Sequence, residues 1–168
     1  MKPANAILSA YGTTIFTVMS ALAEEHGAIN LGQGFPDEEG PEDIRRIAGE
    51  AVRDGPNQYP PMLGLPVLRE AVADANKRFY GLNVDWRTEV MVTSGATEAL
   101  ADCFLGLINP GDEVVLMEPL YDSYLPMVRR AGGVPRLVRM EPPDWVLPQV
   151  ALEAAFSKKT KLLVLNSP

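Results

Sequence analysis

The order in which strand and helix patterns follow one another restricts this chain to one class of fold. From residue 89 to residue 165, short runs of β-branched and apolar residues alternate with stretches of helical periodicity. The patterns predict strands at Val90–Thr93, Glu113–Met117, Val134–Met140 and Lys161–Leu165, with helices between them at Thr97–Leu107, Ser123–Ala131 and Pro148–Ser157. Strands separated by helices form βαβ units, so the sequence predicts an α/β fold with a largely parallel sheet covered on both faces.

Four small residues, Ser94 to Thr97, connect the first predicted strand to the helix that follows it. The first amides of a helix have no acceptor within the helix, and the helix dipole favours an anion there. Small residues would let a ligand approach this backbone, although a tight turn also needs small residues for packing. The segment is neither a GxGxxG fingerprint nor a P-loop. We call Ser94–Thr97 the corner and treat it as a candidate phosphate-binding site.

Helical patterns also precede the alternating region. Apolar residues of the segment Ile15–Ala23 share one face, and the segments Pro41–Asp54 and Pro66–Tyr80 each start at proline and end before glycine. The sequence Ala21-Leu22-Ala23 imitates a signal-peptide cleavage site, but polar residues interrupt the apolar stretch before it. We therefore expect a helix there, a cytoplasmic protein, and no membrane partner, because no apolar run approaches the length of a membrane span.

Charge and cysteine content exclude other classes of protein. The net charge of −7 and the lack of a basic run argue against a nucleic-acid partner. A single cysteine, Cys103, and a single histidine, His26, exclude a disulfide framework and a Cys/His metal site, so no metal is expected. Cys103 falls on the apolar face of its helix and is expected in the core.

Five motifs, in order along the chain, give it a family resemblance. They are "NLGQGFPD" (Asn30–Asp37), "NQYPPMLGLPVLREAV" (Asn57–Val72), "VTSGATEAL" (Val92–Leu100), "NPGDEVVLMEPLYDSY" (Asn109–Tyr124) and "LLVLNSP" (Leu162–Pro168). With these, the chain resembles the class I/II aminotransferases, pyridoxal-phosphate enzymes of fold type I, and among them the methionine, kynurenine, glutamine-type and succinyldiaminopimelate aminotransferases. The resemblance implies an α/β/α sandwich with a mostly parallel sheet. Residues 1–40 would form an N-terminal arm and helix of the small domain, and residues 41–168 the first part of the pyridoxal-phosphate-binding large domain.

The resemblance also implies roles for individual residues. Gly95, Ala96 and Thr97 would bind the cofactor phosphate, Tyr121 would stack on the pyridine ring, and Asn166 would lie near the ring and the substrate. Gly34 would approach the substrate carboxylate, and Tyr59 would reach the cofactor phosphate of a partner subunit, which implies a homodimer with shared sites. From the residues alone, a rim aromatic is the favoured interpretation of Tyr121, Gly34 could equally be a turn glycine, and Tyr59 could be a loop aromatic.

The resemblance places the rest of the catalytic apparatus outside these 168 residues. The Schiff-base lysine, the aspartate at the pyridinium nitrogen and the arginine for the substrate carboxylate are expected beyond Pro168, and none of the lysines here has the family's sequence context. The implied activity is amino transfer between an L-amino acid and a 2-keto acid, with this chain alone inactive. Two alternatives stay open: a lyase of the same fold, such as a cysteine-S-conjugate β-lyase, and a non-catalytic cofactor-binding domain. A nucleotide-binding doubly wound fold is disfavoured because its glycine fingerprint is missing.

Overall fold

The computed structural model describes residues 2–34, 36 and 38–166 and divides the chain into two compact units. Unit 1 consists of Met1–Asn30 and Gly95–Pro168, and unit 2 of Leu31–Ser94. Parts of two motifs, Phe35 and Asp37 in the first and Ser167 and Pro168 in the last, lie outside the described residues.

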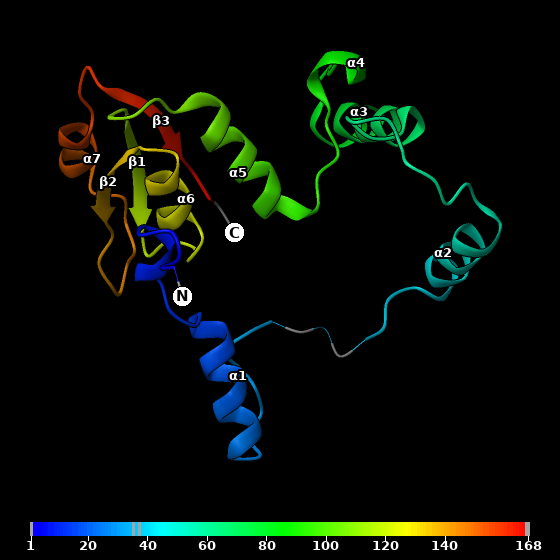
Figure 1. Ribbon diagram of the computed structural model, residues 1–168, viewed down its shortest axis with the longest axis horizontal. Coiled ribbons are helices and arrows are strands. Elements are labelled where there is room, and N and C mark those ends of the chain that lie inside the picture. The colour runs from blue at the N-terminus through cyan, green and yellow to red at the C-terminus, as the bar shows by residue number, and fades with distance from the viewer. Residues whose placement is uncertain (1, 35, 37, 167–168) are drawn as a thin grey trace. The chain divides into compact units, whose positions relative to one another are not determined.

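Unit 1 is built on a parallel sheet with the strand order β2-β1-β3 (Figure 1). The strands are β1 (Glu113–Glu118), β2 (Val134–Arg139) and β3 (Thr160–Val164). Glu113 of β1 is in register with Val134 of β2 and with Thr160 of β3, so β1 is paired along both edges. The predicted parallel α/β architecture is confirmed.

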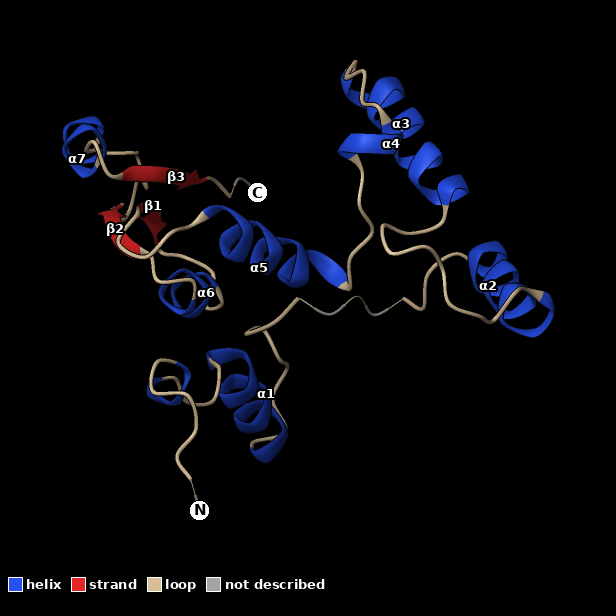
Figure 2. Cartoon of the chain, turned by 45° about the horizontal axis from the view of Figure 1, so that its top comes forward, coloured by secondary structure: helices blue, strands red, loops and turns tan. Residues whose placement is uncertain are grey.

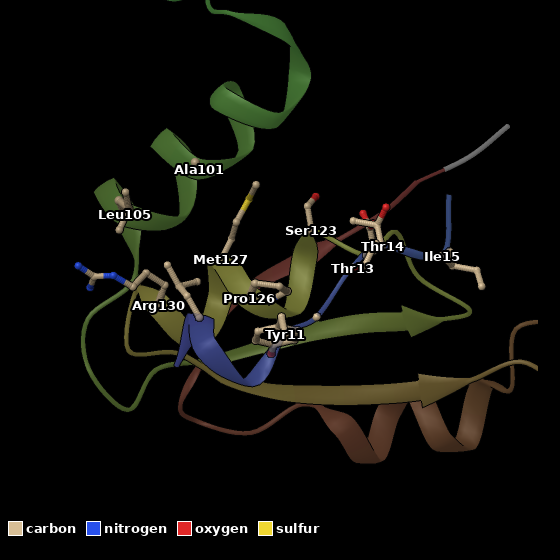
Figure 3. A pocket seen from close by; sticks show the side chains of 13 residues that line it. Tyr11, Thr13, Thr14, Ile15, Ala101, Leu105, Ser123, Pro126, Met127 and Arg130 are labelled. Atoms are coloured by element: carbon tan, nitrogen blue, oxygen red, sulfur yellow. The ribbon is translucent and has the colours of Figure 1, made fainter. Parts of the chain in front are cut away.

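Helices cover both faces of this sheet. Figure 3 shows α5 (Gly95–Leu107) and α6 (Tyr124–Arg130) on one side and α7 (Gln149–Ala155) on the other. The core cluster combines buried side chains of α5, of the residue that follows it, of β1 and of α6, namely Phe104, Ile108, Val114, Leu116, Tyr124 and Val128. Pro126 is tolerated in α6 because it occupies the first turn, where an amide has no acceptor within the helix.

The N-terminal segment of unit 1 packs beside α6. It contains a short 3-10 turn (Leu8–Ala10) and α1 (Ile15–Glu25), whose Thr14 cap accepts a hydrogen bond from the Thr17 amide at 3.3 Å. Arg129 of α6 donates to the Tyr11 hydroxyl at 2.8 Å. The predicted N-terminal helix is therefore present, and the part of the chain that the structure describes has no helix long and apolar enough to cross a membrane.

Unit 2 is helical in its described residues (Figure 2). It comprises α2 (Glu42–Asp54), α3 (Pro66–Tyr80) and α4 (Trp86–Glu89). The predicted strand Val90–Thr93 is wrong: the described residues form no ladder there, and the Val92 amide donates to the Leu63 carbonyl at 3.0 Å. A strand needs a neighbouring strand to pair with, and this segment has none among the described residues.

The expected burial of Cys103 is also wrong, because its side chain is exposed. Phe104 of α5 and Ile108, the residue that follows the helix, are buried in the core cluster, and Leu100 packs against it. Cys103 is rotated by about 100° from Phe104 around the helix, so it leaves the packed stripe. The apolar pattern of α5 was wider than the face that the sheet covers.

Glu113, the first residue of β1, makes polar contacts at the amino end of the sheet. Its buried carboxylate accepts a hydrogen bond from the Ser157 hydroxyl at 2.6 Å and pairs with Arg136 at 3.1 Å. The Ser157 hydroxyl, and after it the Arg136 guanidinium, lower the pKa of the Glu113 carboxyl below its ordinary value. A lowered folded-state pKa means that the carboxylate stabilises the fold above its unfolded pKa of about 4.3, and that this stability is lost as the pH falls through the folded pKa.

We therefore expect Glu113→Gln to lower the urea midpoint of unfolding at neutral pH. The difference from the wild type should shrink as the pH falls below about 4. Urea titrations at a series of pH values measure both quantities. Glu141→Gln is the matched control, because Glu141 pairs with Arg139 on the surface, where ion pairs contribute little. A difference between Glu113→Gln and wild type that is the same at every pH would contradict this assignment.

Candidate active site

The corner lies where α5 begins. Gly95 has a φ of +81°, in the left-handed region that side chains rarely adopt, and a Cβ built on it would meet no heavy atom within 4 Å. The backbone is thus open on that side, and the first amides of the thirteen-residue helix have no acceptor within it. Glu98 is the acidic residue of this first turn, so a bound anion has to sit away from its carboxylate. The geometry suits an anion bound by backbone amides.

A cavity of about 220 Å³ lies where the three strands of unit 1 end. Met117 of β1, Met140 just after β2 and Val164 of β3 contribute to its wall. Tyr121 and Asn166, which are 45 positions apart in the sequence, line this same cavity. The structure therefore brings together two of the residues singled out from the sequence.

The Tyr121 ring is held by two aromatic neighbours and is still 44% exposed. Its centroid lies 6.0 Å from that of Phe16 in α1 and 5.8 Å from that of Tyr124 in α6, with interplanar angles of 40° and 59°. Tilted contacts of this kind are favourable for aromatic pairs. The ring is consequently fixed in orientation while one part of it remains free to contact a planar ligand.

The corner and the cavity belong to the same end of unit 1. In Figure 1 the arrowheads of the strands point toward the end at which α5 begins. This follows from the topology, because a helix that packs antiparallel to the strands places its amino end at their carboxyl ends. Ligands of open parallel sheets bind at that end.

Gly34 and Tyr59 lie in unit 2 and are described within that unit. Tyr59 is 98% exposed on the loop before α3. Gly34 is exposed as well, and a Cβ there would meet nothing within 4 Å. Their roles toward substrate and partner stay predictions.

The structure also shows features that sequence reasoning missed. A groove of about 600 Å³ separates the N-terminal segment from α5 and α6, with Tyr11, Ala101 and Met127 on its walls (Figure 3). The Ser123 hydroxyl beside it is buried without a hydrogen-bond partner among the described residues. No local signal could predict this groove, because it depends on packing between segments about a hundred residues apart. Groups of three or more metal-ligating side chains are absent from the described residues.

Comparison with known proteins defines the class to which this fold and site belong. The family described as "Aminotransferase class I and II" matches residues 26–168, which is most of the chain. The chain belongs to the class I and II aminotransferase family. Members of this family use pyridoxal phosphate as their cofactor.

Individual relatives agree with this assignment. The chain is 48% identical over 163 residues to a probable N-succinyldiaminopimelate aminotransferase of Mycobacterium tuberculosis and 45% identical over 157 residues to the methionine aminotransferase of Escherichia coli. These alignments cover 96% and 94% of this chain and 41% of each relative. The solved structure of the Mycobacterium tuberculosis N-succinyldiaminopimelate aminotransferase matches with a TM-score of 0.92 and 47% identity, over 99% of this chain and 44% of that one. The predicted fold type I architecture is confirmed, and the chain spans about two fifths of its relatives' length.

The residues present fit pyridoxal phosphate. The open backbone at Gly95 suits the phosphate, the partly exposed Tyr121 ring suits a flat heteroaromatic ring, and the Asn166 amide offers a polar partner in the same cavity. Each feature matches one chemical part of the cofactor.

Proposed function

We propose that this chain forms the cofactor-binding part of a pyridoxal-phosphate-dependent aminotransferase that moves an amino group between an L-amino acid and a 2-keto acid. The observation that carries the proposal is the shared cavity of Tyr121 and Asn166 at the carboxyl end of a parallel sheet, in a chain of the aminotransferase family. The position of the corner at the same end of unit 1 supports it.

The chain's residues would divide the work of holding the cofactor. The amides of Gly95, Ala96 and Thr97 bind the phosphate, and Tyr121 fixes the tilt of the ring. Asn166 supplies a hydrogen-bonding amide near the ring, and Gly34 lets the backbone approach the substrate carboxylate. When bound, pyridoxal phosphate supplies an electron sink that stabilises negative charge at the substrate Cα. The protein contributes orientation and electrostatics.

The lysines of this chain do not supply the basic group that proton transfer requires. Lys2, Lys77, Lys158, Lys159 and Lys161 are all exposed. None of them lines the cavity of Tyr121 and Asn166. We infer that the lysine that handles the proton belongs to another part of the intact protein, so that this chain alone is inactive.

Keto-acid formation by the intact protein is the experiment that tests this function. The names of the relatives suggest methionine, kynurenine and N-succinyldiaminopimelate as amino donors, each paired with a 2-keto acid acceptor. Stoichiometric appearance of the donor's keto acid and the acceptor's amino acid supports amino transfer. Release of ammonia and pyruvate from a cysteine S-conjugate, without transfer, would instead identify a lyase. Binding of the cofactor with neither reaction would leave a non-catalytic domain.

We further propose a cytoplasmic homodimer in which Tyr59 completes the partner's site. The exposed Tyr59 side chain can reach another subunit. The proposal includes the expected division of the chain at residue 40 into a part of the small domain and a part of the large domain. In a mixed dimer, a Tyr59→Phe chain should weaken phosphate binding in its partner's site by about 0.5–3 kcal/mol, the range for one hydrogen bond depending on charge assistance. In these mixed dimers, one chain also carries Gly95→Val, which disables the phosphate site of that chain. Cofactor titration then measures the remaining site alone and shows which of the two sites the Tyr59→Phe change has weakened. Damage confined to the Tyr59→Phe chain's own site would rule out the shared arrangement.

A further inference from the structure

Arg69 of α3 is a buried arginine without an acidic partner among the described residues. Only 6% of it is exposed, and none of the ion pairs between described residues includes it. Its guanidinium donates instead to two backbone carbonyls, from Nε to Val90 at 2.8 Å and from Nη2 to Arg87 at 2.9 Å. The guanidinium carbon lies 5.3 Å from the centre of the Trp86 ring. A buried cation is costly unless its donors are satisfied, so this position is specified by its contacts.

One carbonyl belongs to Arg87, the second residue of α4, and the other to Val90, the residue that follows α4. α4 is a single turn, so its carbonyl groups lack N–H donors within the helix, and an arginine side chain can supply the missing donors. Arg69 therefore ties α3 to the chain as it leaves α4. The bond to Val90 joins residues 21 positions apart in the sequence, so it holds the segment after α4 against α3.

A second attachment holds the same segment two residues later. The Val92 amide donates to the Leu63 carbonyl at 3.0 Å. Gly64 has a φ of +98°, and a Cβ there would lie 2.5 Å from Cγ2 of Val92, so Val92 packs directly against the backbone before α3. The chain is thus held at Val90 and at Val92, immediately before it reaches Ser94, the first residue of the corner.

We propose that Arg69 is a positioning residue for the phosphate-binding corner. It contacts neither cofactor nor substrate; by fixing the carbonyl groups of Arg87 and Val90 it restricts the conformations of the segment that enters Ser94. The inference rests on the proposed function, since it assumes that the corner binds the cofactor phosphate. Without this attachment the segment 90–93 that leads into the corner has more conformational freedom, and the additional entropy lost when the phosphate binds reduces the affinity.

The test uses the intact enzyme with Arg69→Met, Arg69→Lys and a matched control, Arg87→Met. Arg87 stacks on the same Trp86 ring at 4.5 Å but is exposed, so its loss removes an arginine from that ring without removing a bond to Val90. Three readouts are needed: the dissociation constant for pyridoxal phosphate, the ³¹P resonance of the bound phosphate, and the melting temperature of the apoenzyme. The ³¹P resonance reports the surroundings of the phosphate, which a purely structural role would leave unchanged.

We expect Arg69→Met to raise the dissociation constant by about tenfold and to shift or broaden the ³¹P resonance. Arg69→Lys should recover part of the affinity, because an ammonium can still reach one carbonyl, and Arg87→Met should match the wild type in affinity and resonance. Wild-type affinity and resonance in the Arg69 variants would overturn the proposal, as would equal losses in Arg87→Met. If Arg69→Met fails to fold, Arg69→Lys decides alone by the same two measurements.

Gly95→Val separates the failure of this inference from the failure of the proposed function. If Gly95→Val weakens cofactor binding but the Arg69 variants do not, the corner binds phosphate without help from Arg69. If neither change affects cofactor affinity, the assignment of the corner itself is wrong.

Discussion

Replacing Gly95 by valine is expected to weaken the affinity of the intact enzyme for pyridoxal phosphate by about a hundredfold. Valine at a φ of +81° costs about 1–3 kcal/mol, so the backbone would move away from the conformation that presents the first amides of α5. The lost charge-assisted bonds to the phosphate are worth about 1.5–3 kcal/mol more. Fluorescence titration of the apoenzyme with the cofactor measures the change.

Gly106 provides the matched control in the same helix. It lies in the last turns of α5 without a positive φ, and a Cβ there would meet nothing within 4 Å. Gly106→Val should leave cofactor affinity unchanged, since the new side chain points into open space in an ordinary helical conformation. Equal losses in both variants would mean that disturbance of α5, and not the geometry of the corner, had lowered the affinity.

Replacing Tyr121 by alanine is expected to reduce cofactor affinity by about thirtyfold in the intact enzyme. The change removes the ring that lines the cavity together with Asn166, and with it about 2 kcal/mol of apolar contact and ring stacking. Tyr121→Phe keeps the ring and should stay within about threefold of the wild type. Equilibrium titration with pyridoxal phosphate, together with the near-ultraviolet circular dichroism of the bound cofactor, measures both the affinity and the ring's orientation.

An exposed tyrosine elsewhere in the chain serves as the control, because it shows whether replacing any tyrosine by alanine lowers cofactor affinity. Tyr80, at the end of α3, is 75% exposed. Tyr80→Ala should leave both measurements unchanged. A Tyr121→Ala enzyme with wild-type affinity and an unaltered dichroism signal would show that Tyr121 is a rim aromatic and not the residue that stacks on the ring.

Local patterns predicted most helices and strands of the fold, and the exceptions have physical causes. The end of α3 at Tyr80 and the start of β1 at Glu113 agree with the predictions because glycine, proline and apolar periodicity act within a few residues. The strand expected at Val90–Thr93 failed because strand formation depends on a partner elsewhere in the chain. The prediction that Cys103 is buried was wrong for a similar reason. Periodicity shows which side chains share a face of a helix, but not how much of that face another element covers.

The residues of the candidate site likewise include some that local sequence patterns or topology predict and others that they do not. The corner at Gly95 was visible in the sequence because small residues at a helix start are a local signal. The meeting of Tyr121 and Asn166 followed from topology, since the carboxyl ends of parallel strands share one end of a sheet. Arg69 gave no such signal, because its partners are backbone carbonyls that any sequence possesses.

The central place of β1 has a consequence for the making of this protein. Its three fully buried residues, Val114 to Leu116, leave the ribosome before either neighbouring strand exists, and Thr160 of β3 follows Glu113 by 47 positions. At synthesis rates of about 5–20 residues per second, the strand waits roughly 2–10 seconds for its second edge to be covered. Phe104 and Ile108, which are translated earlier, can shield one face during that interval. In that interval an unpaired edge of β1 is available to other chains, which favours aggregation of the nascent chain until β3 arrives.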